Sequence, residues 1–259
     1  MSITTLHRSL RHLAALAAVA APLAFGAAQA APVGLELSLL IDVSGSVDNT
    51  EYNLQKQGYV QAFQSTAVQN AILGSQLGSI AVNLIQWSSA NQVAQSVGFT
   101  LINNVASANA FAAAVNTISR SFAGNTAPGN AIAFAAPLFL SNAFEGLRQV
   151  IDVSGDGAEN NGINTLAARN AALASGVDTI NGLVILGEAG VQSFYQNNIV
   201  GGANAFLAVA NSFDDFAAAI EAKLVREIST PTPVPEPASL ALFGVGLAGL
   251  GMIRRRKAA

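Results

Sequence analysis

Apolar runs of strand length alternate with segments of helical spacing along most of the chain. Nearly continuous apolar runs, such as 35–42 and 79–87, are typical of strands buried on both faces of a parallel sheet. Residues 91–99 alternate between polar and apolar, as a half-exposed edge strand does. The expected strands are 35–42, 79–87, 91–99, 148–154, 177–186 (interrupted at Asn181-Gly182) and 205–210, and the expected helices are 49–73, 106–118, 128–140, 165–174 and 213–228.

This alternation predicts an α/β fold with a doubly wound, mostly parallel central sheet flanked by helices. Residues 31–228 are enough for one such domain with a substantial core, and the length argues against two domains. The chain outside this range has a different composition at each end.

The first thirty residues are expected to be a secretory signal peptide. Arg8 and Arg11 form a basic start, an Ala-rich apolar core follows, and Ala28-Gln29-Ala30 has the small-x-small pattern of a cleavage site. The alternative is an uncleaved anchor helix, which the short apolar core disfavours. The sequence therefore predicts export across the inner membrane.

The other end carries a second bipartite segment. Residues 229–237 are Pro-rich, which predicts an extended linker, and this linker ends in Pro235-Glu236-Pro237. Residues 238–259 contain an apolar run that is followed by an Arg cluster. These three features in this order resemble the PEP-CTERM sorting tail of Gram-negative bacteria. The resemblance implies an exosortase as partner, removal of the tail, membrane attachment before processing, and a final place at the cell surface, outside the cell or in the periplasm. The alternative is a plain C-terminal membrane anchor.

Composition excludes several kinds of chemistry. The chain has no cysteine, and its two histidines, His7 and His12, both lie in the signal segment. The exported part therefore has no thiolate, no Ser-His-Asp triad and no histidine-ligated metal site. Residues 31–235 hold six basic and fourteen acidic side chains, which argues against a nucleic-acid partner.

Candidate chemistry lies in three loops. Asp42, Ser44 and Ser46 follow the first apolar strand within five positions, Thr126 precedes a predicted helix, and Asp156 stands between two glycines after another strand. The carboxyl ends of parallel strands are where open α/β sheets place their ligands, and oxygen donors suit a hard cation such as Mg²⁺. Each loop alone is also compatible with a turn or a helix cap.

Taken together, the three loops resemble a von Willebrand factor A-type domain with its metal-ion-dependent adhesion site. The likeness spans roughly residues 35–228 and implies a sheet with one antiparallel edge strand. It implies that Ser44 and Ser46 bind the metal (Mg²⁺ or Mn²⁺) directly, that Asp42 and Asp156 act directly or through water, and that Thr126 joins when ligand is bound. The segments 85–89 and 153–157 resemble the corresponding segments of a bacterial subgroup of this family whose function is unknown.

Few carboxylates and several hydroxyls would leave a cation electron-poor, with an open position for an outside carboxylate. The expected function is therefore a non-enzymatic binding or adhesion module whose partner, a protein or an extracellular matrix ligand, offers an acidic group. The alternatives are a metal-assisted hydrolase using Asp42 and Asp156, or a structural envelope protein.

Two neighbouring positions are ambiguous. Asp152 lies about 13 Å from Asp156 along an extended strand, so both cannot hold one ion, and Asp152 is expected to have a buried partner of its own. Asn160 and Asn161 follow the Asp156 loop and either support the site or simply solvate the loop.

Overall fold

The structure is a computed structural model in which residues 30–230 are described. The predicted cleavage motif, apart from Ala30, and the predicted sorting tail with Pro235-Glu236-Pro237 lie outside the described residues. Within the described part of the chain, no helix is long and apolar enough to cross a membrane.

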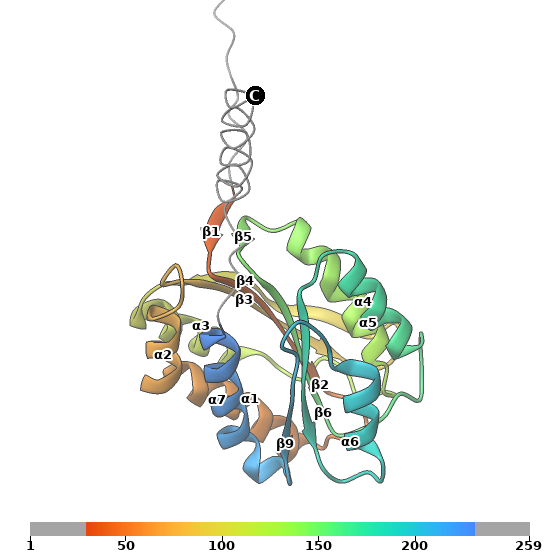
Figure 1. Ribbon diagram of the computed structural model, residues 1–259. Helices are drawn as coiled ribbons and strands as arrows, with labels where there is room; N and C mark the ends of the chain where they lie inside the picture. Colours follow the sequence, from red (N-terminus) through yellow and green to blue (C-terminus); the bar gives the residue numbers. More distant parts are fainter. Residues whose placement is uncertain (1–29, 231–259) are drawn as a thin grey trace, which may run out of the picture.

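A seven-stranded sheet forms the centre of the fold (Figure 1). The strand order is β4-β3-β2-β6-β7-β8, with β9 beside β7. Strands β2, β3, β6, β7 and β9 run parallel, whereas β4 pairs antiparallel with β3 at one edge, as predicted. The strand bounds are β2 Leu35–Asp42, β3 Ile80–Trp87, β4 Val93–Ile102, β6 Gln149–Gly155, β7 Thr179–Ile185, β8 Gly201–Gly202 and β9 Leu207–Ala210.

Helices cover both faces of this sheet, which confirms the doubly wound arrangement (Figure 1). One face carries α1 (Asn49–Gln64), α2 (Thr66–Leu73), α3 (Val105–Thr117) and α7 (Phe216–Ser229), and the other carries α4 (Pro128–Ala135), α5 (Thr165–Ala174) and α6 (Val191–Phe194). The longest helix among residues 30–230, α1, starts at a capping box in which Asp48 and Glu51 satisfy each other's backbone amides.

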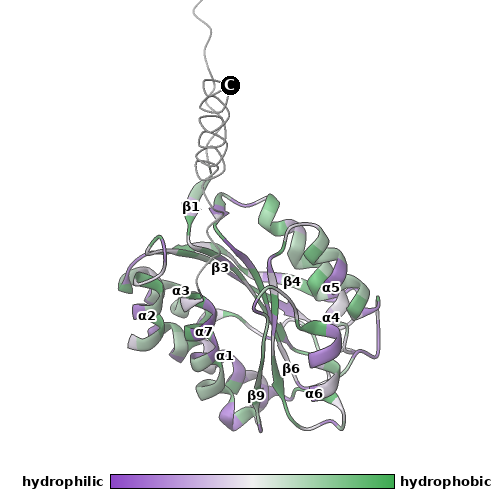
Figure 2. Cartoon of the chain, in the orientation of Figure 1, coloured by the Kyte–Doolittle hydropathy of each residue, from purple (hydrophilic) through white to green (hydrophobic). Residues whose placement is uncertain are grey.

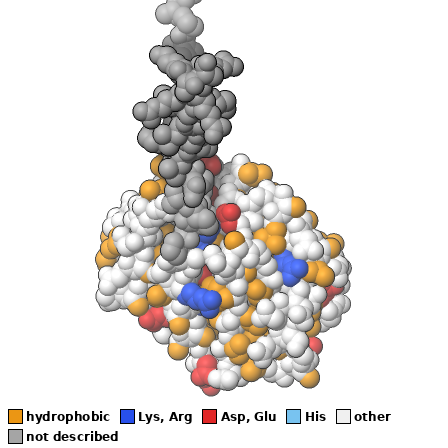
Figure 3. Space-filling view, in the orientation of Figure 1, with side chains coloured by type: hydrophobic (Ala, Val, Ile, Leu, Met, Phe, Trp, Pro, Cys, Tyr) orange, Lys and Arg blue, Asp and Glu red, His pale blue; other side chains and the backbone are white. Residues whose placement is uncertain are grey.

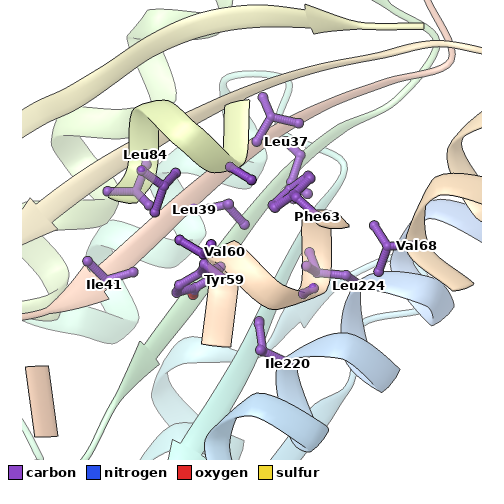
Figure 4. Packing of buried hydrophobic residues seen from close by; sticks show 14 of the residues in the cluster. Leu37, Leu39, Ile41, Tyr59, Val60, Phe63, Val68, Leu84, Ile220 and Leu224 are labelled. Carbon is purple, nitrogen blue, oxygen red and sulfur yellow. The ribbon is translucent and has the colours of Figure 1, made fainter. Parts of the chain in front are cut away.

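Two hydrophobic clusters fill the spaces between the sheet and its helices. In β2, Leu37, Leu39 and Ile41 point toward α1 and α7 (Figure 4). Leu40 belongs to the cluster on the opposite face. This alternation explains why all eight residues of β2 are buried although only every second one faces each layer. The strands are correspondingly apolar, and polar residues gather on the outer helices and loops (Figure 2).

The predicted helix over 49–73 is wrong in one respect, because the chain forms two helices there. Ser65 has extended backbone angles and caps α2 by accepting a hydrogen bond from Val68 N at 3.2 Å. A serine hydroxyl that competes for backbone amides favours such a cap over a helix interior.

The interruption predicted at Asn181-Gly182 is also wrong, because β7 runs unbroken from Thr179 to Ile185. A Cβ at Gly182 would lie 2.8 Å from Leu207 Cδ1 and 3.1 Å from Tyr195 Cδ1, so the glycine makes room for close neighbours inside a regular strand.

Several short elements were not predicted. β1 (Ala31–Val33) pairs in parallel with β5 (Phe144–Gly146), and β8 adds a short antiparallel pairing at the β7 edge.

Two predicted helices contain 3₁₀ segments. The predicted helix over 128–140 becomes 3₁₀ at η1 (Ala136–Leu140), and the one over 213–228 begins as a 3₁₀ turn, η3 (Phe213–Asp215). A π-helical turn, η2 (Tyr195–Ile199), continues α6.

The two ends of the described chain lie at the amino ends of the strands. Gly34, at the start of β2, lines the same pocket as Ser229 and Thr230, at the end of α7. The carboxyl ends of β2 and β6 therefore point away from both ends (Figure 1). On the face shown in Figure 3, basic side chains stand apart from one another rather than in a patch.

Candidate metal centre

Two of the predicted site loops follow neighbouring central strands. Asp42 is the last residue of β2, and Asp156 follows the last residue of β6, which is paired with β2 in parallel. The third loop, which holds Thr126, precedes α4 and is tied to the first by a hydrogen bond from Gly45 N to Gly124 O of 2.7 Å. The topology thus brings the three loops to one end of the sheet.

A chain of polar contacts joins the first and last of these loops. Asp42 Oδ1 accepts a hydrogen bond from Ser44 N at 2.7 Å, and the hydroxyls of Ser44 and Ser46 lie 3.1 Å apart. Ser46 Oγ donates to Asp156 Oδ1 at 2.7 Å, across 110 positions of sequence. Four of the five predicted residues are therefore joined by one continuous series of polar contacts.

Thr126 lies beside this group, held mainly through its backbone. Its amide donates to Asn160 Oδ1 at 2.9 Å, and its carbonyl accepts from the amides of Asn160 and Asn161 at 3.0 and 3.2 Å. Its hydroxyl would be 3.4 Å from a Cβ placed on Gly157, next to Asp156. The two asparagines therefore hold the Thr126 loop against the Asp156 loop.

Among residues 30–230, neither carboxylate of the site forms an ion pair with a Lys or Arg side chain. Asp42 is fully buried, and its Oδ2 has no hydrogen-bond partner among residues 30–230. This burial, with the charge of Asp156 added, raises the pKa of Asp42 to about 7. Burial also raises the pKa of Asp156, and the charges of Glu51 and Glu188 add to the shift.

A divalent cation fits these residues. An orphaned buried carboxylate oxygen costs free energy until a cation or donor satisfies it, and the adjacent hydroxyls are ligands for a hard cation. In the part of the chain the structure describes, no three His, Cys, Asp or Glu side chains form a metal-holding group. Any cation here would therefore depend on hydroxyls and outside ligands as well as on its two carboxylates.

Two supporting residues were not predicted from the sequence. Arg120 donates to the carbonyls of Val43 and Ser44 at 3.1 and 2.7 Å, and Gln55 Nε2 donates to Asp42 O at 3.1 Å. They fix the backbone of the first loop from outside. No local pattern identifies them, because Arg120 is brought to the loop only by the tertiary fold.

Asp152 lies in the sheet–helix interface. It is buried, and its Oδ1 is 2.6 Å from Lys223 Nζ, which also contacts Glu227 Oε1 at 2.5 Å. Glu227 Oε1 accepts a further hydrogen bond from Asn181 Nδ2 at 2.7 Å. The expectation of a buried partner for Asp152 is confirmed, and that partner is a lysine of α7.

A doubly wound sheet with an antiparallel β4 edge and Asp-x-Ser-x-Ser after its central strand defines the von Willebrand factor A-type class. The chain belongs to the protein family of unknown function DUF1194, which matches residues 32–232. Residues 233–257 match the PEP-CTERM protein-sorting motif. No curated protein matches the chain.

Solved structures share the fold at low sequence identity. The pilus adhesin SpaC of Lactobacillus rhamnosus GG aligns with a TM-score of 0.56 and 17% identity, over 77% of this chain and 31% of SpaC. Proximal thread matrix protein 1 of the mussel byssus, in a structure with a zinc-occupied metal-ion-dependent adhesion site, aligns with a TM-score of 0.55 and 15% identity, over 80% of this chain and 49% of that protein. This chain thus spans half or less of these relatives.

Stability of the metal-free protein is expected to fall as pH rises from about 5 to 8. The pKa values of Asp42 and Asp152 are raised to about 7 in the folded state, against 3.8 unfolded, so the folded state binds more protons between these values. Their contribution is complete below the unfolded pKa and is lost as pH rises through about 7. Thermal unfolding followed by circular dichroism in EDTA measures this trend.

Added Mg²⁺ is expected to reverse part of the trend, stabilising the protein more at pH 8 than at pH 5, because a cation must displace the proton of Asp42. A metal-free stability that rises over this range would contradict the burial of these two carboxyls.

Proposed function

We propose that this protein is an exported surface module that binds Mg²⁺ or Mn²⁺ at Asp42, Ser44, Ser46, Thr126 and Asp156 and docks a carboxylate of a partner on that cation. The observation that carries the proposal is the connected chain of polar contacts from Asp42 to Asp156, together with the buried Asp42 Oδ2 that has no partner among residues 30–230.

The donor chemistry favours docking over permanent caging. Two ionised carboxylates balance the charge of a divalent cation, and the neutral hydroxyls fill only part of its coordination shell. A carboxylate from outside can then take an open position and gain a charge-assisted contact. The partner is therefore a molecule with an accessible Asp, Glu or other carboxylate, such as a protein or an acidic matrix component.

Orientation supports the same function. Gly34 and Thr230 lie at the amino ends of the strands, and the site lies at the carboxyl ends. A chain exported through a signal segment at 1–30 and attached through the sorting motif at 233–257 would direct the site away from its attachment. Removal of the motif by an exosortase would leave that polarity unchanged.

A hydrolytic role for Asp42 and Asp156 has less support. No histidine occurs outside the first twelve residues, so proton transfer would fall to Asp42 and Asp156, the same carboxylates that would hold the cation. We therefore propose a binding protein without catalytic activity.

Acetate tests the open coordination position. In the Mn²⁺-loaded protein, the methyl NMR signal of acetate is expected to broaden because its carboxylate approaches the paramagnetic ion, whereas that of methanol, the control, is expected to broaden far less. Addition of EDTA should remove the effect. Equal broadening of both probes in a protein that binds Mn²⁺ would contradict carboxylate docking.

A further inference from the structure

A second orphaned polar atom lies against the same site. The hydroxyl of Tyr195 is fully buried and has no hydrogen-bond partner among the described residues. It lies 2.5 Å from the position of a Cβ built on Gly155, and Asp42 Oδ2 lies 2.6 Å from that same position. Two unpaired oxygens, one able to donate and one able only to accept when ionised, therefore converge on the space left by one missing side chain.

Two glycines leave room for the Tyr195 side chain to reach the metal site. Tyr195 begins the π-helical turn η2 and is fully buried within the cluster between the sheet, α4 and α5. Its ring edge lies 3.1 Å from a Cβ built on Gly182, in β7, and its hydroxyl reaches Gly155, at the end of β6. A Cβ at Gly155 would displace the hydroxyl, and one at Gly182 would crowd the ring. π-Helical turns are rare and are often found at functional sites.

We propose that Tyr195 is a positioning residue of the metal centre, whose hydroxyl donates a hydrogen bond to Asp42 Oδ2 when the cation is bound. The inference rests on the proposed function, since it concerns how the same site holds its metal. Tyr195 would not touch the cation, and its role is to fix the carboxylate that faces it.

The chemistry of Asp42 explains why such a donor is needed. Ser44 N already satisfies Oδ1 at 2.7 Å, so Oδ2 is the oxygen whose direction is not yet fixed. Asp156, whose charge acts on Asp42, cannot donate when ionised, and Arg120 donates to the carbonyls of Val43 and Ser44. A tyrosine hydroxyl supplies a proton donor without adding charge. Removal of such an outer partner typically costs 10- to 100-fold in metal affinity.

Tyr195→Phe tests the proposal, because it keeps the ring and removes only the hydroxyl. The purified full-length protein is titrated with Mg²⁺, followed by calorimetry and by fluorescence of its only tryptophan, Trp87, whose register partner is Asp42. The variant is expected to bind Mg²⁺ about tenfold more weakly than the wild type. Its urea midpoint in EDTA is expected to stay the same or rise, because the lost hydroxyl has no partner in the metal-free protein.

Tyr59→Phe is the matched control. The Tyr59 hydroxyl is also buried, but it shares a hydrogen bond of 3.1 Å with Ser154 Oγ. This variant is expected to show the opposite pattern, with a lower urea midpoint and unchanged Mg²⁺ affinity. If Tyr195 had a purely structural role, both variants would instead show the same changes in urea midpoint and in Mg²⁺ affinity.

The NMR signals of ¹³Cζ-labelled tyrosine give a second readout on the unmodified protein. Of the three tyrosines, Tyr195 is expected to move most on addition of Mg²⁺. Tyr195→Phe with wild-type affinity, or an unmoved Tyr195 signal, would overturn the inference and leave the proposed function intact. A wild-type protein that does not bind Mg²⁺ at all would overturn both.

Discussion

Gly155→Ala is expected to abolish measurable Mg²⁺ binding and to destabilise the fold. A Cβ at this position would lie 2.5 Å from Tyr195 Oη, 2.6 Å from Asp42 Oδ2 and 2.8 Å from Asp42 Cβ, all far inside normal contact distances. Asp42 or the end of β6 must then move, and overpacking of this kind costs about 1–3 kcal/mol. Calorimetry with Mg²⁺ and urea unfolding in EDTA measure the two effects separately.

Gly157→Ala is the control for this substitution. It lies two positions further along the same loop, yet its nearest contacts would be 3.4 Å away, an ordinary packing distance. Its stability is expected to remain within about 0.5 kcal/mol of the wild type. If Gly155→Ala behaved like Gly157→Ala in both assays, the close approach of Asp42 to β6 would be wrong.

Lys223→Met is expected to cost about 3–5 kcal/mol of stability. The ammonium lies 2.6 Å from Asp152 and 2.5 Å from Glu227, and the side chains of both ion pairs are fully shielded from solvent. Methionine fills a similar volume but leaves the two carboxylates buried without a cation. Chemical denaturation of the full-length protein at pH 8.5, above the raised pKa of Asp152 of about 7, measures the loss.

Two further variants separate charge from packing. Lys56→Met, which removes a partly exposed lysine from α1, is expected to change stability by less than about 1 kcal/mol. Adding Asp152→Asn to the Lys223→Met variant should recover part of the loss, because one buried charge is removed. A loss below about 1 kcal/mol for Lys223→Met alone would mean that the ion pairs do not hold α7 to the sheet.

Much of the fold was predictable because its signals are local. The apolar run over 35–42 and the alternation over 91–99 predicted a buried strand and an edge strand, and both formed. The short strands β1, β5 and β8 escaped prediction because each is too short for a pattern and exists only through a distant partner. The break at Ser65 was missed, although a serine followed by threonine inside a helical pattern is a recognisable cap signal.

The candidate site shows the same division between local and tertiary information. Asp42, Ser44 and Ser46 form a local sequence pattern, and parallel strand order explains why Asp156 lies beside them. Arg120 and Tyr195 could not be predicted, because each reaches the site from another element. Gly182 gave a signal of a different kind, because a glycine inside an apolar strand indicates that another group approaches closely, although not which one. Gly155 gave no such signal, because it follows the predicted strand over 148–154.

The most direct test of the metal site is a calorimetric Mg²⁺ titration of the purified wild-type protein beside Asp42→Ala and Ser44→Ala, in metal-free buffer near pH 7.5. Saturable binding at one site is expected in the wild type and loss of binding in both variants, whose unfolding midpoints in EDTA show that they remain folded. No binding in the wild type, or equal binding in all three proteins, would contradict the proposed metal site.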